Sequence, residues 1–140
     1  MTADEIIATL KLAPHPEGGW FRETWRAAAE KGERASGTAI YYLLKAGERS
    51  HWHRVDATEI WHYYAGAPLK LSVSEDGKTA RDIILGTDLA KNESPQIALA
   101  PYCWQAAQSL GDWTLVGCTV SPGFEFSGFE MAPKDWAPGQ

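Results

Sequence analysis

The sequence contains no apolar run that approaches the ~20 residues needed for a membrane-spanning helix. Its amino terminus carries Asp4 and Glu5 where a secretory signal would be basic, and no long apolar stretch follows them. These absences predict a cytoplasmic protein without a membrane partner.

Basic residues are too few for a general nucleic-acid-binding protein. The chain has 13 Lys and Arg against 18 Asp and Glu, which gives a formal net charge of −5. Such a protein needs an excess of positive charge to neutralise phosphates. We therefore expect no nucleic-acid partner, although a few buried arginines would still suffice to hold one small anion.

Cysteine is also scarce. Cys103 and Cys118 both lie in runs that are typical of strands, and neither has a spacing that suggests metal or redox chemistry. In a cytoplasmic protein we expect both thiols to be free and buried.

Turn-forming and aromatic residues are abundant instead, with 13 Gly, 8 Pro and 7 Trp. This composition favours an all-β fold, and the length fits a single domain over residues 1–140. Thr2 and Glu5 form a capping-box pattern before Ile6, which predicts a short N-terminal helix. Strands are predicted at residues 20–26, 38–45, 50–54, 59–64, 69–74, 81–85, 96–100, 104–110, 113–120 and 124–131. Many short strands with regular turns indicate a sandwich or barrel.

One segment carries candidate chemistry. His51 and His53 are two residues apart, so in a regular strand they project to the same face, with Cα atoms ~6.6–6.8 Å apart. The next predicted strand begins at Glu59 and can fold back to bring a carboxylate to the same point. Two histidines and a carboxylate with open positions suit Fe, Mn, Ni or Zn as a divalent metal. The competing interpretation is a hydrogen bond from His53 to Glu59 that holds two strands in register.

The order His51, His53, Glu59 and Gly66 resembles the first motif of the cupin superfamily. The spacing from Glu59 to Gly66 matches, but five residues instead of three or four separate His53 from Glu59. The second cupin motif normally adds a histidine, whereas here Gln105 stands near that position and no histidine follows His62. Because a neutral amide binds transition metals poorly, a bound metal remains an open question.

Further stretches resemble one small cupin family. They are His15 to Thr24, Thr58 to His62, Trp104-Gln105 and Leu115 to Phe126, which together extend over most of the chain. This resemblance implies a double-stranded β-helix (jelly-roll) barrel, a homodimer, and a ligand pocket inside the barrel. It also implies a relation in shape to deoxysugar epimerases and seed storage proteins, without assigning a reaction.

Several side chains are candidate pocket residues. On the strand that begins at Glu59, Trp61 and Tyr63 share its face and line the pocket if Glu59 points into the barrel, with a core-filling role as the alternative for Trp61. Arg22 would suit a phosphate or carboxylate if its side chain turned inward, with a surface salt bridge as the alternative. Trp104 and Gln105 are candidates for the pocket mouth. Gly18-Gly19 either lets the backbone approach a ligand or only makes a turn, of which we take the plain turn, and no role is assigned to His15.

Three functional hypotheses follow. In the first, His53 is a general base, Glu59 orients it and Tyr63 is the acid of an isomerase or epimerase that acts on a small polar metabolite, such as a sugar or nucleotide sugar. In the second, His51, His53 and Glu59 hold a metal in a dioxygenase-like enzyme. In the third, the barrel binds a small molecule without catalysis.

Overall fold

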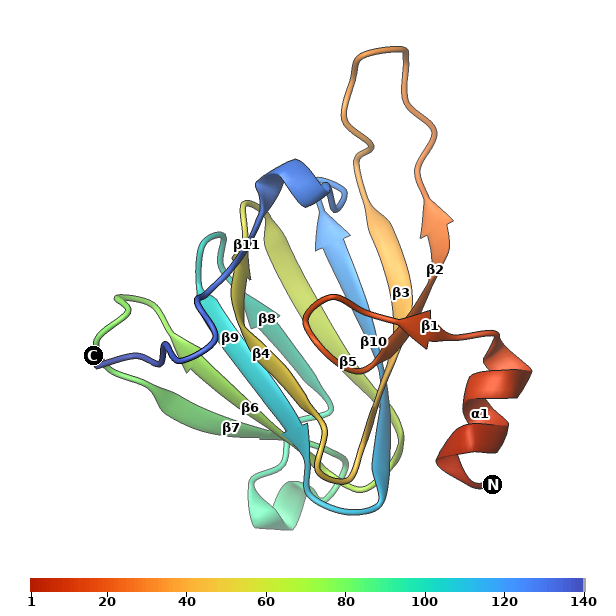
Figure 1. The fold of residues 1–140 in the computed structure, drawn as a ribbon, viewed down its shortest axis with the longest axis vertical. Helices are drawn as coiled ribbons and strands as arrows, with labels where there is room; N and C mark the ends of the chain where they lie inside the picture. The colour runs from red at the N-terminus through yellow and green to blue at the C-terminus, as the bar shows by residue number, and fades with distance from the viewer. Residues whose placement is uncertain (140) are drawn as a thin grey trace.

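The computed structural model describes residues 1–139, and its strands form two antiparallel sheets (Figure 1). In chain order the elements are α1 (Ala3–Leu10), β1 (Ala13–Pro14), β2 (Trp20–Arg26), β3 (Thr38–Lys45), β4 (Arg49–Val55), β5 (Thr58–Gly66), β6 (Leu69–Ser74), β7 (Arg81–Leu85), the 3-10 turn η1 (Leu89–Lys91), β8 (Gln96–Leu99), β9 (Trp104–Ser109), β10 (Trp113–Ser121), the 3-10 turn η2 (Phe126–Gly128) and β11 (Phe129–Met131).

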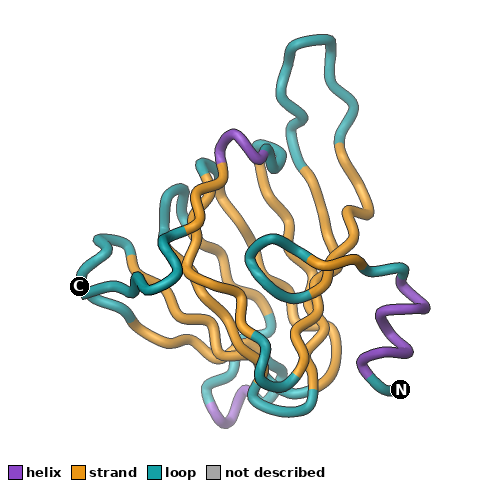
Figure 2. The backbone as a smooth tube through the Cα atoms, in the orientation of Figure 1, coloured by secondary structure: helices purple, strands orange, loops and turns teal. Residues whose placement is uncertain are grey.

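The two sheets have the strand orders β1-β2-β3-β10-β5-β8 and β11-β4-β9-β6-β7. Loops connect the strands at both ends, and helical segments are few and short among the described residues (Figure 2). This architecture confirms the predicted all-β jelly-roll barrel with one short N-terminal helix. Within residues 1–139, no helix has the length and apolar character to cross a membrane.

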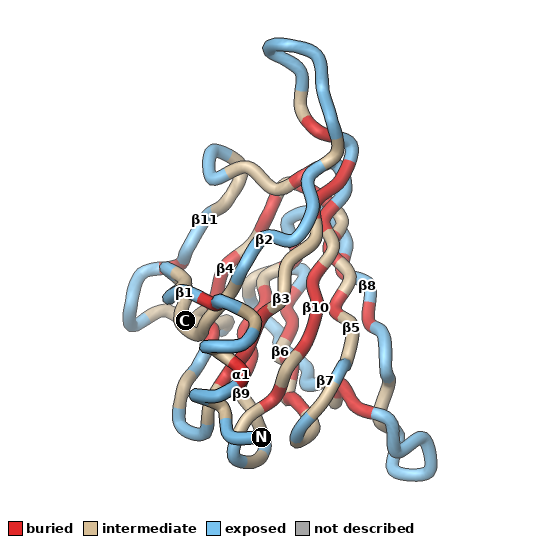
Figure 3. The backbone as a smooth tube through the Cα atoms, turned by 90° about the vertical axis from the view of Figure 1, so that its right-hand side faces the viewer, coloured by how far each residue is buried: buried red, intermediate tan, exposed pale blue. Residues whose placement is uncertain are grey.

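Buried side chains from both sheets fill the space between them. In β6, Leu69, Leu71 and Val73 are at most 1% exposed, and the residues between them are only partly buried. They belong to one apolar cluster with Trp61 of β5 and Val116 of β10. The buried stretches accordingly run along the middle of the strands, while the loops are exposed (Figure 3). The alternation seen in the sequence is therefore the alternation between barrel core and outer face.

Helix α1 covers the outer face of the first sheet. Its predicted capping box is present, because the Glu5 amide donates to Thr2 Oγ1 and the Thr2 amide donates to Glu5 Oε1. Ile6 packs in a cluster with Leu43 of β3. Tyr42, the neighbour of Leu43, belongs to the core cluster inside the barrel, so Leu43 lies on the opposite face of the sheet.

The predicted last strand is shorter than expected. Instead of a strand over residues 124–131, the chain makes the turn η2 and then pairs with β4 only along β11. The turn is fixed where the Asp56 amide donates to the Gly128 carbonyl at 3.1 Å. Residues 122–129 consequently lie across one end of the barrel.

Candidate functional site

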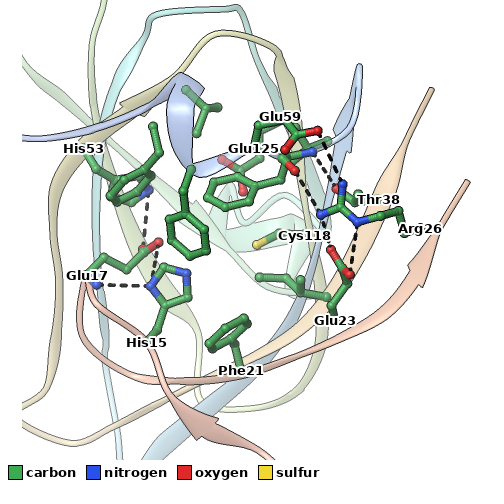
Figure 4. A pocket seen from close by; sticks show the side chains of 16 residues that line it. His15, Glu17, Phe21, Glu23, Arg26, Thr38, His53, Glu59, Cys118 and Glu125 are labelled. Atoms are coloured by element: carbon green, nitrogen blue, oxygen red, sulfur yellow. Dashed lines mark hydrogen bonds and ion pairs between the residues drawn. The ribbon is translucent and has the colours of Figure 1, made fainter. Parts of the chain in front are cut away.

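A cavity of about 250 Å³ lies between the sheets, at the end where β3 and β5 begin and β4 and β10 end (Figure 4). Polar and apolar side chains share its wall. The lining residues are His15, Glu17, Phe21, Glu23, Arg26, Thr38, Ile40, His53, Val55, Glu59, Cys118, Val120, Phe124, Glu125, Phe126 and Phe129.

The loop at residues 14–19 places His15 and Glu17 in this wall. The loop closes on itself, because the His15 amide donates to the Gly19 carbonyl at 2.9 Å. It is joined to β4 by the His51 amide, which donates to the Glu17 carbonyl at 2.9 Å. Gly18 has φ +106°, and a Cβ there would lie 2.1 Å from the Arg49 carbonyl oxygen. Glycine is thus required for this close approach, which corrects the interpretation of Gly18-Gly19 as a plain turn.

A β-bulge separates the two histidines of β4. From Ser50 to His53, β4 advances three residues while its partner β9 advances two, from Ala107 to Gln105. The bulge turns His53 toward the cavity and His51 away from it. His51 Nε2 lies 3.0 Å from the Pro133 carbonyl oxygen, outside the cavity wall. The expected common face of His51 and His53 is therefore wrong, because it assumed an unbroken strand.

His53, Glu17 and His15 form a contiguous polar cluster. His53 Nε2 lies 3.4 Å from Glu17 Oε2, and His15 Nδ1 lies 3.3 Å from Glu17 Oε1 (Figure 4). The Ser50 hydroxyl donates to Glu17 Oε2. His53 Nδ1 is 2.7 Å from the His51 carbonyl, which can only accept, so Nδ1 carries the proton and Nε2 keeps its lone pair.

Burial sets the protonation of these three groups. It lowers the pKa of His15 to about 4, with a further contribution from His53. It also lowers the pKa of His53, which the charge of Glu59 partly offsets. Burial raises the pKa of Glu17 to about 8, against the opposing hydrogen bond from Ser50. At neutral pH both imidazoles are neutral and Glu17 is protonated, so their contacts are not ion pairs.

A second carboxyl group, Glu59, is held from behind by a chain of hydrogen bonds. Gln105 Nε2 donates to Glu59 Oε1 at 2.9 Å, and Trp61 Nε1 donates to Gln105 Oε1 at 2.8 Å. Because the indole can only donate, it fixes which end of the amide faces Glu59. Burial raises the pKa of Glu59 to about 7, against the attraction of His53. Glu59 is therefore partly ionised at neutral pH and faces His53 across the cavity.

The cavity wall does not contain five of the other expected site residues, the four described here and Trp104. The Tyr63 hydroxyl donates to the Gly66 carbonyl at 2.5 Å, outside the cavity wall. The Arg22 guanidinium lies 5.6 Å from the centroid of the Tyr41 ring on the outer face of the first sheet. Trp61 and Gln105 lie directly behind Glu59 rather than in the wall.

Trp104 is likewise placed away from the cavity. Its ring contacts Trp136 and lies 4.5 Å from the Arg54 guanidinium. This cluster covers the outer face of the second sheet with the C-terminal segment. Trp104 therefore packs on the outer face of the barrel and does not lie at the mouth of the pocket, where it was expected.

The donor set does not fit the metal centre that the first cupin motif implies. Among residues 1–139, no group of three or more His, Cys, Asp or Glu side chains is arranged to hold a metal ion. His51 faces away, and the amide of Gln105, near the position of the usual further histidine, is occupied by Trp61 and Glu59. No step is therefore assigned to a metal.

Of the charged and polar side chains in the cavity wall, only His53 and Glu59 were predicted from the sequence as site residues. His15 and Glu17 come from a Pro- and Gly-rich loop with no strand periodicity, and Glu23 and Arg26 lie on β2 beside the expected Arg22. The adjacent glycines were the available signal, since paired glycines permit close backbone approach.

Comparison with known proteins agrees with the fold. A protein from Shewanella oneidensis is 38% identical, with a TM-score of 0.89 over 94% of this chain and 85% of that one. A hypothetical protein from Leishmania major is 32% identical, with a TM-score of 0.85 over 94% of this chain and 88% of its own. Oxalate decarboxylase from Bacillus subtilis is 13% identical over 84% of this chain and 29% of its own, with a TM-score of 0.66, and shows the fold alone. No curated protein matches. The family model described as Cupin superfamily (DUF985) matches residues 4–132, so the chain belongs to this cupin family.

Proposed function

We propose that the chain is an acid–base catalyst of the isomerase or epimerase type, which transfers protons on one small polar molecule inside the barrel. The observation that carries this proposal is the 3.4 Å contact between His53 Nε2 and Glu17 Oε2 in the cavity wall. Burial opposes charge on both groups and leaves a neutral base beside a protonated acid. Pairs of titratable groups with such opposed protonation are typical of acid–base sites.

His53 is the base of the proposed reaction. Its Nδ1 proton is held by the His51 carbonyl, so Nε2 is free to accept a proton from a substrate carbon next to a carbonyl group. The resulting imidazolium is stabilised by the partly ionised Glu59. This role is electrostatic, whereas the sequence led us to expect that Glu59 orients His53; the His51 carbonyl takes that part.

Glu17 is the acid, in place of Tyr63. Its carboxyl proton passes to the substrate carbonyl oxygen while His53 takes the proton from carbon, which gives an enol without net change in protonation of the pair. Transfer of the proton from His53 to the neighbouring carbon of the enediol, with return of the remaining hydroxyl proton to Glu17, completes an isomerisation. An epimerisation requires in addition that the enol turn, so that His53 delivers its proton to the opposite face of the same carbon. The distance of 3.4 Å between His53 Nε2 and Glu17 Oε2 is long for a hydrogen bond, and catalytic contacts of this kind shorten when substrate is bound.

The cavity size limits the substrate. Its volume of about 250 Å³ lies just below the range of ~300–1,000 Å³ usual for ligand pockets. A single sugar or another polar molecule of that size fits, and its apolar face would lie against the phenylalanines. A nucleotide sugar would have to place its phosphates at the mouth, beside Glu23 and Glu125.

Solvent exchange tests the proposal with a panel of compounds and needs no identified substrate. Aldoses, ketoses, amino sugars and nucleotide sugars are incubated with the protein in D2O, and loss of carbon-bound proton signals is followed by NMR. We expect exchange in at least one compound, and its loss in His53→Gln, which fills the space without a base. His62→Gln is the matched control, because His62 lies on the outer face and contacts Thr119. Absence of exchange across the panel, or equal exchange by His53→Gln, would contradict a catalytic role and leave a binding module.

A further inference from the structure

The charged groups in the cavity wall are unbalanced. Among the described residues, four carboxyl groups line it, those of Glu17, Glu23, Glu59 and Glu125, against the single guanidinium of Arg26. We propose that the cavity binds a small organic cation, a protonated or quaternary amine. The proposal deepens the proposed function, on which it rests for the identity of the site, by assigning the charge of the ligand.

The guanidinium of Arg26, the permanent cation of the described wall, is already neutralised. Arg26 Nη2 lies 2.7 Å from Glu23 Oε1, and Arg26 Nη1 lies 3.9 Å from Glu125 Oε1 (Figure 4). Nη2 also donates to the Phe124 carbonyl at 3.0 Å. An anionic ligand would have to break these contacts, and Arg22, the arginine expected to meet an anion, lies on the outer face.

Aromatic rings supply the apolar part of the site. The ring centroid of Phe124 lies 4.9 Å from that of Phe126 and 5.8 Å from that of Phe129, in edge-to-face arrangements. On the other side of the cavity, the Phe21 ring packs edge-to-face on His15 at 4.5 Å. The electron-rich faces of such rings attract an alkylammonium group without requiring a hydrogen bond. Phenylalanine walls alone would accept a neutral molecule equally well, so the carboxyl groups decide the charge.

The ionisation of Glu59 responds to a bound cation. Glu59 and Glu17 are buried and hold protons more tightly than usual in the free protein, because burial penalises their charged forms. His53 and His15, which face them, are neutral at neutral pH. A cation in the cavity favours the ionised form of Glu59, whose pKa of about 7 is the lower of the two, so the wall gains negative charge when the ligand arrives while Glu17 keeps the proton that it donates. The free cavity thereby avoids several unpaired charges in its interior.

Three probes of one shape and different charge test the inference. Choline carries a trimethylammonium group. Its neutral carbon analogue is 2-tert-butylethanol, in which a tert-butyl group replaces trimethylammonium. The anionic probe is the carboxylate of tert-butylacetic acid. Affinity is measured for each by isothermal titration calorimetry at neutral pH on the full chain. We expect choline to bind about tenfold or more tightly than the neutral alcohol, which is the ratio that a desolvated cation–π contact with a nearby carboxylate supplies. The anion should bind weakest.

Two variants separate cation recognition from cavity shape. Phe129→Leu keeps an apolar side chain but removes a π face, and Glu125→Gln removes a partly exposed carboxylate at the mouth. Both should reduce the choline affinity several-fold and leave that of the neutral alcohol nearly unchanged. Glu130→Gln is the matched control, because Glu130 pairs with Arg54 outside the cavity. Retained binding of the neutral alcohol shows that a variant is folded.

Each outcome has one meaning. Choline binding that is no tighter than the neutral alcohol, strongest binding of the anion, or no binding of choline would overturn the inference. Choline binding without any proton exchange would leave the cation site standing and refute the proposed catalysis. Proton exchange in an uncharged sugar, without any binding of choline, would support the proposed catalysis and refute the cation site.

Discussion

Glu17→Gln is expected to stabilise the protein at neutral and higher pH and to leave its stability near pH 4.5 unchanged. An ordinary glutamate has a pKa of 4.5, and burial raises that of Glu17 to about 8 in the folded chain. Between these values the folded chain holds a proton that the unfolded chain has released. The free energy of unfolding therefore falls as pH rises, by ~1.4 kcal/mol per pH unit. This contribution is fully present below pH 4.5 and is lost as pH rises toward 8.

The magnitude follows from that interval. At pH 7 the free energy of unfolding is lower than at pH 4.5 by on the order of 3 kcal/mol because of Glu17. The reason is that pH 7 lies about two and a half units above the ordinary pKa of a glutamate. Glutamine has no proton to take up. An amide nitrogen in the place of Oε2 has two N–H groups, which can donate to His53 Nε2 and to the Ser50 hydroxyl oxygen, the two groups that contact Oε2 in the parent.

Urea denaturation between about pH 5 and pH 8 measures this difference. The stability of the variant minus that of the parent should grow from near zero at the acid end to several kcal/mol at the alkaline end. Both proteins share the residual pH dependence. It belongs to Glu59, whose raised pKa of about 7 lowers stability as pH rises, and to His15 and His53, whose lowered pKa values raise stability as pH rises to the ordinary value of 6.5. Glu130→Gln, at an exposed carboxylate, should follow the parent. Parallel curves for Glu17→Gln and parent would mean that Glu17 is ionised in the folded protein, and its role as the acid would then be wrong.

Two further substitutions test how the site is held. Trp61→Phe removes the donor that fixes the Gln105 amide and replaces the indole by a smaller ring. The free energy of unfolding, measured by urea denaturation, should fall by about 2–4 kcal/mol. A decrease below about 1 kcal/mol would argue against this role of Trp61. Gly18→Ala places a Cβ against the Arg49 carbonyl at a positive φ, and should cost ~3 kcal/mol or more and weaken ligand binding in the cavity. A Gly18→Ala protein with parental stability would mean that the loop does not need this close approach.

The fold could be predicted because its evidence is local. Alternation at Leu69, Leu71 and Val73 fixes which face of β6 enters the core, and the same pattern recurs in strand after strand. The capping box at Thr2 and Glu5 fixes the start of the helix. These signals need only neighbouring residues, so a single sequence contains them in full.

The site could be predicted only in part, because it depends on contacts between distant segments. His53 and Glu59, which the motif singled out, both line the cavity. The bulge that turns His51 outward could not be predicted, because a regular strand and a bulged strand have the same kind of residue pattern in a single sequence. Glu17 reaches the cavity through a loop held by the backbone of β4, and no propensity of the loop itself places it there.

Two departures from the first expectation point in the same chemical direction. The bulge removes the imidazole of His51 from the cavity, and Gln105 provides an amide near the position where the cupin pattern usually has a histidine. Each change takes away one nitrogen donor for a metal. Each position also makes a hydrogen bond to a group in the cavity wall: the His51 carbonyl fixes the tautomer of His53, and the Gln105 amide donates to Glu59. Because both positions now orient an acid or base group, these two changes favour the proposed proton transfer over metal chemistry.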